Sequence, residues 1–191
     1  DLDRILAHPD VSYRQGPAAL SLTQATEYGQ VYTVAEFRDL TATAKASGLR
    51  VHVDGARLAN AAAAGFDLTC FPRSGVDVLV MGGTKAGLPL SEALVIFDHA
   101  LTRRLDARLK HAGQLVSKAR FLAAPWIGML ESGAWTARSA HANRMAQKLA
   151  DGLTTRTPYT LAHPVEANAV FVHMPPADLE RLHAAGWFVY R

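Results

Sequence analysis

Two short apolar segments, each followed at once by polar residues, constrain the fold of this chain more than any other feature. Residues 49–53 run into Asp-Gly-Ala-Arg at 54–57, and residues 76–81 run into Gly-Gly-Thr-Lys at 82–85. Such apolar runs are typical of parallel strands that are buried on both faces. The carboxyl ends of parallel strands open onto a crevice, where open α/β sheets keep their functional groups. We therefore predict an α/β fold with a functional site at residues 54–57 and 82–85.

The segments on either side predict a βαβ arrangement around this pair. Residues 18–26 alternate apolar and hydroxyl side chains, as in a strand. A capping box formed by Thr33 and Glu36 opens a helical pattern that ends at Gly48. A second helix, rich in alanine, is expected at residues 57–64. Strand, helix and strand of these lengths form one parallel unit.

The character of the chain changes after a further strand, which is expected at residues 93–97. The connection at 86–92 is too short for a parallel crossover, so this strand should run antiparallel to its neighbour. Beyond it we predict three helices, at residues 100–112, 115–130 and 134–153. They are followed by a strand at 169–174, a helix at 178–185 and a strand at 187–190. This shift from alternating strands and helices to a mainly helical region predicts one domain at residues 1–110 and a smaller α+β domain at 111–191.

Two of these predicted helices carry features that can be checked directly. Pro125 should bend or break the helix at 115–130, because proline removes a helical hydrogen bond. In the helix at 134–153, Met145, Leu149 and Leu153 recur on one face.

Composition narrows the classes of function. The net charge of the 191 residues is +3 and the basic residues are scattered, which does not favour nucleic-acid binding. The apolar runs are too short to span a bilayer, so we expect no membrane partner and a cytoplasmic location. The single cysteine, Cys70, excludes an intrachain disulfide and indicates no metal cluster. We expect Cys70 to be a small buried apolar residue and Trp126 and Trp135 to pack in the core.

The residue types at the two strand ends suit pyridoxal 5'-phosphate. A lysine such as Lys85 forms a Schiff base with the aldehyde, and a carboxylate such as Asp54 keeps the pyridine nitrogen protonated. Arg57 can bind a carboxylate with its planar fork, and Thr84 can donate to phosphate. Nearby glycines at 82, 83 and 87 allow the backbone to approach the cofactor.

Each of these residues also has an ordinary structural interpretation. Asp54 can be the N-cap of the following helix, Lys85 a solvated loop lysine, and Arg57 one partner of a salt bridge. Nucleotide binding is not favoured, because the segment around Lys85 lacks the spacing of an ATPase phosphate loop and no GxGxxG is present.

Three longer stretches resemble a known family. They are TQATEYGQVYTVAEFRDLTATAKASGLRVHVDGARLANAAAA, DVLVMGGTKAGLPLSEALVIFD and KHAGQLVSKARFLAAPWIGMLESGAW. They resemble the low-specificity threonine aldolases, including the phenylserine aldolases. The resemblance implies an aspartate-aminotransferase-like fold, in which residues 1–110 are the C-terminal half of the large domain and 111–191 an incomplete small domain. It also implies that the chain is a fragment, without the family's N-terminal part and extreme C-terminus.

The resemblance assigns roles to individual residues. Lys85 matches the Schiff-base lysine, Asp54 the carboxylate that faces the pyridine nitrogen, and Arg57 the arginine that binds the substrate carboxylate. Thr84 matches the residue before the lysine, near the cofactor phosphate. Arg120 resembles an arginine that reaches the phosphate in the neighbouring subunit, and a surface helix arginine is its alternative. The family's ring-stacking histidine has no match in this chain.

The function implied by the resemblance is aldol cleavage. Threonine, allo-threonine and phenylserine would be split into glycine and an aldehyde by a homo-oligomer, as a dimer or a tetramer. Two alternatives stay open. One is a β-eliminating lyase or racemase that uses pyridoxal phosphate on the same fold. The other is a catalytically incomplete fragment that acts only as a binding or assembly module.

Overall fold

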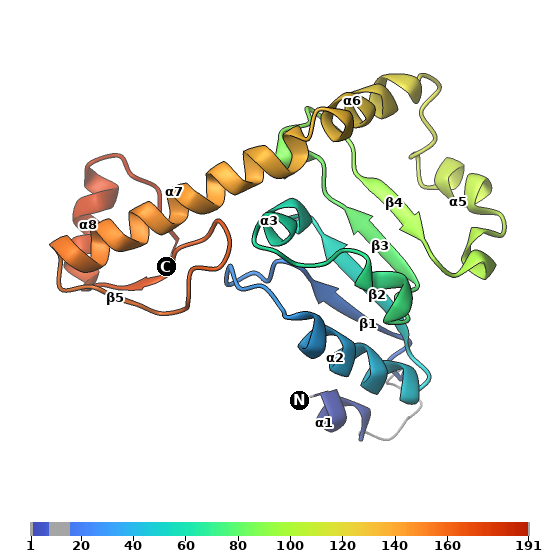
Figure 1. Ribbon diagram of the computed structural model, residues 1–191, viewed down its shortest axis with the longest axis horizontal. Helices are drawn as coiled ribbons and strands as arrows, with labels where there is room; N and C mark the ends of the chain where they lie inside the picture. Colours follow the sequence, from blue (N-terminus) through green and yellow to red (C-terminus); the bar gives the residue numbers. More distant parts are fainter. Residues whose placement is uncertain (1, 8–15, 191) are drawn as a thin grey trace.

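The structure is a computed structural model, and it describes residues 2–7 and 16–190. Its centre is a four-stranded sheet in the order β1 (Ala19–Thr23), β2 (Arg50–Gly55), β3 (Val78–Met81) and β4 (Ala93–Ile96) (Figure 1). The first three strands are parallel and β4 is antiparallel to β3. The predicted parallel βαβ unit and the reversed direction of the fourth strand are confirmed. Strands β1 and β3 are shorter than predicted, since β1 ends at Thr23 and β3 begins at Val78, whereas β2 extends two residues further, to Gly55.

The helices between the strands follow the predicted signals. In α2 (Val34–Ala46), Thr33 accepts a hydrogen bond from Glu36 N and the Glu36 carboxylate accepts one from Thr33 N, which confirms the capping box. These contacts with Thr33 lower the pKa of Glu36. The alanine-rich helix α3 (Leu58–Ala63) is followed by Gly65, whose φ of +99° suits glycine. A short helix, α4 (Cys70–Arg73), leads toward β3.

An aromatic cluster forms the centre of the core beside the sheet. The rings of Phe37, Phe66 and Phe71 lie with their centroids 5.4–5.9 Å apart. Cys70 lies in the same buried cluster with no exposed surface, so the prediction that it is a buried apolar residue is confirmed. Burial also raises the pKa of its thiol, which makes Cys70 a poor nucleophile.

The helices after the sheet differ from prediction in two places. A 3-10 turn, η2 (His99–Thr102), and α5 (Leu105–His111) occupy the mixed-charge region. The next helix, α6 (Arg120–Glu131), begins five residues later than predicted, and Pro125 lies inside it without breaking it. Proline costs one backbone hydrogen bond. Burial of Trp126 and Met129 on the inner face of α6 outweighs that loss.

The long helix α7 (Ala134–Arg156) buries a different face from the one predicted. Its buried residues are Trp135, Ser139, Ala146 and Ala150. Met145 and Leu149 are 44% and 54% exposed, so the apolar face that they mark is not the buried face of the helix. The small side chains of Ala146 and Ala150 let neighbouring segments approach the helix closely.

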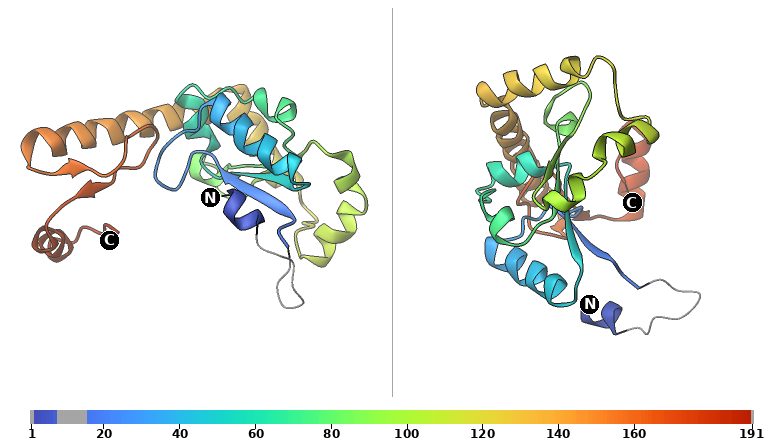
Figure 2. Two further views of the ribbon diagram at one scale, coloured as in Figure 1. Left: turned by 90° about the horizontal axis from the view of Figure 1, so that it is seen from below. Right: turned by 90° about the vertical axis from the view of Figure 1, so that its right-hand side faces the viewer.

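The C-terminal unit lies at the far end of α7, away from the sheet (Figure 2). It contains β5 (Thr160–Leu161), β6 (Val172–His173) and α8 (Pro176–Ala184). The helix was predicted, whereas the strand at 169–174 shrinks to two residues. The strand predicted at 187–190 is wrong: those residues are irregular, because no strand among the described residues pairs with them. None of the described helices is both long enough and apolar enough to cross a membrane.

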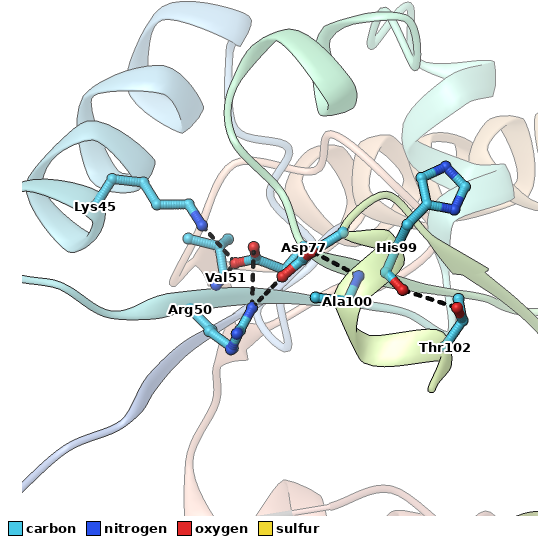
Figure 3. Close-up of polar contacts among 8 residues, drawn as sticks. Lys45, Arg50, Val51, Asp77, His99, Ala100 and Thr102 are labelled. Atoms are coloured by element: carbon cyan, nitrogen blue, oxygen red, sulfur yellow. Dashed lines mark hydrogen bonds and ion pairs between the residues drawn. The ribbon is translucent and has the colours of Figure 1, made fainter. Parts of the chain in front are cut away.

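A charged cluster joins the strands at the amino end of the sheet. The buried carboxylate of Asp77 accepts hydrogen bonds from Lys45 Nζ at 2.5 Å and Val51 N at 2.6 Å (Figure 3). Arg50 Nη1 lies 3.7 Å from Asp77 and also binds Asp98. The hydrogen bond from Arg50, followed by that from a backbone N–H, lowers the pKa of Asp98. This cluster lies at the opposite end of the sheet from residues 54–57 and 82–85.

Candidate active site

The carboxyl ends of β2 and β3 meet, as the sequence predicted. Asp54 and Gly55 pair with Val80 and Met81, and Gly82 N donates to Gly55 O at 2.9 Å. A Cβ at Gly82 would lie 2.5 Å from Ala56 O, closer than atoms can pack. Glycine at position 82 is therefore required by contact between the two strand-end segments themselves.

Asp54 lies half-buried at the end of β2 with one carboxylate oxygen in use. Its Oδ1 accepts the backbone N–H of Ala56 at 2.9 Å, which fixes the orientation of the side chain. Its Oδ2 has no hydrogen-bond partner within residues 2–7 and 16–190. The N-cap of α3 is Arg57, so the alternative that Asp54 caps this helix is wrong.

Arg57 lies at the same edge and contacts a third strand end. Its Nη1 lies 3.4 and 3.5 Å from the two carboxylate oxygens of Glu27, in the loop that follows β1. That loop is tied to β2, since Gln24 N donates to Asp54 O at 3.0 Å. Arg57 is 26% exposed and Glu27 is 71% exposed. The guanidinium is therefore accessible, and it already faces a carboxylate.

Thr84 and Lys85 project from a one-turn 3-10 helix, η1 (Thr84–Ala86), directly after β3. Both are exposed, whereas Ala86 and Leu88 anchor the turn in the core. The Lys85 ammonium makes no hydrogen bond or ion pair within the described parts of the chain. Among the described residues its side chain is therefore unpaired, at the edge of the sheet that also carries Asp54 and Arg57.

Several side chains to which the sequence assigned no role at this site hold the Lys85 segment. Glu92 Oε2 accepts Gly83 N at 2.6 Å, and Trp135 Nε1 donates to Gly82 O at 3.0 Å. Arg138 Nη1 donates to Gly87 O at 3.2 Å, and Trp126 Nε1 donates to Ser91 Oγ at 3.1 Å. Both tryptophans are buried, as predicted. The position of Glu92 could have been predicted from the sequence. Because β4 runs antiparallel to β3 and Met81 pairs with Ala93, Glu92 lies opposite the start of the Lys85 segment.

Arg120 is placed apart from the strand-end residues. It is the first residue of α6, it is exposed, and its guanidinium lies 5.9 Å from the centre of the Phe121 ring. No hydrogen bond or ion pair joins it to another described residue. The described residues also contain no group of three His, Cys, Asp or Glu side chains able to hold a metal ion.

Comparisons with known proteins place this geometry in a family. The profile of the beta-eliminating lyases matches residues 1–176. The chain is 45% identical over 190 residues to a low specificity L-threonine aldolase of Pseudomonas sp., a match that covers 97% of this chain and 54% of that protein. The chain thus spans about half the length of the curated relatives that it matches.

Solved structures support the same assignment. A threonine aldolase of Leishmania major superposes with a TM-score of 0.88 at 29% identity, over 96% of this chain and 54% of that one. A PLP-dependent aminotransferase of Streptococcus suis superposes with a TM-score of 0.69 at 16% identity, over 98% of this chain and 51% of that one. These likenesses confirm the predicted aspartate-aminotransferase-like α/β fold. By sequence and by structure, the chain belongs to the beta-eliminating lyase family.

Proposed function

We propose that this chain carries the lysine-bearing half of a pyridoxal 5'-phosphate site. The observation that supports the proposal is that a free amine, Lys85, and a carboxylate with an unused oxygen, Asp54, project from adjacent parallel strand ends. Both groups are accessible rather than engaged in ion pairs, which is what a covalently bound aldehyde and a protonated ring nitrogen require. The residues present therefore fit the cofactor.

Each residue has one role in the proposed site. Lys85 would hold the aldehyde carbon of the cofactor, and Asp54 would keep the proton on its pyridine nitrogen. Thr84 would donate its hydroxyl to the cofactor phosphate, and Arg120 would pair with the cofactor phosphate in a neighbouring subunit. When bound, the cofactor supplies an electron sink for a bond broken at the α-carbon of an amino acid. Arg57 binds and orients the carboxylate of that amino acid.

The proposed reaction is cleavage of a β-hydroxy-α-amino acid into glycine and an aldehyde. Support comes from the 45% identity to a protein named low specificity L-threonine aldolase, over an alignment that covers 97% of this chain. Threonine, allo-threonine and phenylserine are the proposed substrates. The reaction needs a base for the β-hydroxyl proton, and we assign that role to no residue of this chain.

A spectroscopic titration tests the cofactor site. Pyridoxal phosphate bound to a lysine gives a visible absorbance band, which we expect on addition of the cofactor to the chain. The band should be lost in Lys85→Ala and kept in Lys110→Ala, a matched change at an exposed lysine of α5. A band that survives in Lys85→Ala would show that another lysine holds the cofactor.

Product analysis tests the reaction. Incubation of the loaded chain with threonine or phenylserine should yield glycine and an aldehyde. Pyruvate and ammonia from a β-hydroxy amino acid would instead identify an eliminating lyase. Cofactor binding without turnover would identify the chain as a catalytically incomplete binding module.

Assembly, location and domain division belong to the same proposal. We propose a homo-oligomer, a dimer or a tetramer, in which Arg120 serves the adjacent subunit, and we propose that it works in the cytoplasm. Sedimentation of wild type and Arg120→Ala, with and without the cofactor, tests the assembly. The division into domains 1–110 and 111–191 stays a prediction, and limited proteolysis between α5 and α6 would test it.

A further inference from the structure

The turn that carries Lys85 is too short to hold its own shape. It consists of three residues, closed by hydrogen bonds from Ala86 N to Gly83 O at 3.0 Å and from Gly87 N to Thr84 O at 3.1 Å. Thr84 and Lys85 themselves are exposed. A 3-10 turn of this length has little intrinsic stability. The position of Lys85 therefore depends on the groups that hold the backbone on either side of it.

On the side before Lys85, the backbone is held by the carboxylate of Glu92. Oε2 accepts the N–H of Gly83 at 2.6 Å, and Oε1 lies 3.4 Å from the N–H of Thr84. Hydrogen bonds to an ionised acceptor are about twice as strong as neutral ones. Residues 82–92 connect β3 to β4, and Met81 pairs with Ala93 across the two strands. Glu92 is thus the last residue of this connection, and its carboxylate binds the backbone at the beginning of the same connection.

Helix α7 holds the backbone on both sides of Lys85. Trp135 and Arg138 are three residues apart, so they project from one face of this helix. The Trp135 indole binds Gly82 O and the Arg138 guanidinium binds Gly87 O. These two carbonyls stand before and after Lys85. The lysine turn is thus fixed by two side-chain donors from α7 and by the carboxylate of Glu92, directly before β4.

We propose that Glu92 is a positioning residue for Lys85, acting together with Trp135 and Arg138. The inference rests on the proposed role of Lys85 in binding pyridoxal phosphate. Glu92 binds the two N–H groups directly before the lysine, so its loss frees the backbone at the point where the side chain begins. A reacting group misplaced by about 1 Å can lose about 100-fold in rate. Glu92 contributes through geometry and need not touch the cofactor.

The test compares Glu92→Ala and Glu92→Gln with Glu131→Gln. Glu131 is an exposed residue at the end of α6, without a side-chain partner among the described residues. Two quantities are measured: the rate and affinity with which pyridoxal phosphate produces the visible band, and the hydrogen exchange of the Gly83 and Thr84 amides by NMR. The exchange measurement needs no cofactor and no activity.

We expect Glu92→Ala to slow formation of the band by about 10- to 100-fold and to speed Gly83 amide exchange. Glu92→Gln should fall between Glu92→Ala and wild type, since its amide oxygen accepts one N–H while its NH₂ group cannot accept the other. Glu131→Gln should match wild type in both measurements. An unchanged thermal unfolding midpoint in Glu92→Gln would show that the substitution affects the turn and not the stability of the whole fold.

Two results would contradict parts of this account, and they are distinguishable. If Glu92→Gln and Glu92→Ala form the band at the wild-type rate, with unchanged Gly83 exchange, the positioning role is overturned. If the wild-type chain forms no band, the proposed cofactor site fails. In that case, exchange of the Gly83 and Thr84 amides still tests whether Glu92 fixes the turn. The measurement can be made on whichever Glu92 variant stays folded.

Discussion

Arg57 faces Glu27 across the carboxyl edge of the sheet, with its Nη1 3.4 Å from Glu27 Oε1. The residue proposed to bind a substrate carboxylate is thus already opposite a carboxylate of the protein. Glu27 is 71% exposed, so the pair is a weak surface ion pair that a ligand can displace. The interpretation of Arg57 as a salt-bridge residue and its proposed role in binding are therefore compatible.

Glu27→Gln should strengthen substrate binding, because it removes the group that competes for Arg57. Surface ion pairs are worth about 0.2–1 kcal/mol, so KM should fall by up to about fivefold with kcat unchanged. Steady-state kinetics or glycine binding to the loaded chain measures the change. Glu180→Gln, an exposed change on α8, is the control. A rise in KM would mean that Glu27 orients Arg57 instead of competing for it.

Asp77→Ala should destabilise the chain mainly by leaving the Val51 N–H without a partner. Lys45 is 38% exposed and can turn to water, so the cost should stay near 2–3 kcal/mol, below that of a fully buried ion pair. Asp77→Asn keeps an acceptor and should cost about 1 kcal/mol. Denaturant unfolding measures both, with the exposed Asp39→Asn as control. Equal losses in the two Asp77 variants would show that the charge matters rather than the acceptor.

The contribution of Asp98 to stability should disappear in acid. The hydrogen bond from Arg50 lowers the pKa of Asp98 below its ordinary value of 3.8. A lowered pKa in the folded state means that the stabilisation is complete above the unfolded value and is lost as pH falls through the folded value. Asp98→Asn should therefore be less stable than wild type at pH 7, with a gap that closes below about pH 4. A gap independent of pH, measured by urea unfolding, would contradict this account.

Cys70 should resist thiol reagents in the native protein and react when the chain unfolds. It has no exposed surface, and burial raises the pKa of its thiol, so both access and thiolate formation are suppressed. We expect modification of the native chain to be at least about 100-fold slower than in denaturant, which corresponds to an opening free energy of about 3 kcal/mol. Rapid labelling without denaturant would show that the region around α4 opens readily.

The parts of the fold that depend on local signals could be predicted from the sequence. Thr33 and Glu36 define the start of α2 by themselves. The eleven residues between Met81 and Ala93 are too few for a parallel crossover, so β4 must run antiparallel to β3. The shared location of Asp54, Arg57 and Lys85 could be predicted because the carboxyl ends of parallel strands meet at one edge of the sheet. Each of these inferences needs only neighbouring residues and chain geometry.

The contacts that hold the site could not be predicted in this way. Trp135 and Gly82 are separated by 53 positions, and Arg57 and Glu27 by 30, so no local pattern encodes either contact. Tertiary packing also overrides local preference. Pro125 stays inside α6 because Trp126 and Met129 are buried, and Met145 is exposed because α7 buries its alanine face.

The cluster around Asp77 and the site around Asp54 share strand β2 but lie at its two ends. Val51, which binds Asp77, is three residues from Asp54, a separation of about 10 Å along an extended strand. Effects of substitutions this far apart, with no shared partner, generally add. Substitutions at the amino edge can therefore be used to change the stability of the chain without changing the geometry of the candidate site at the other edge.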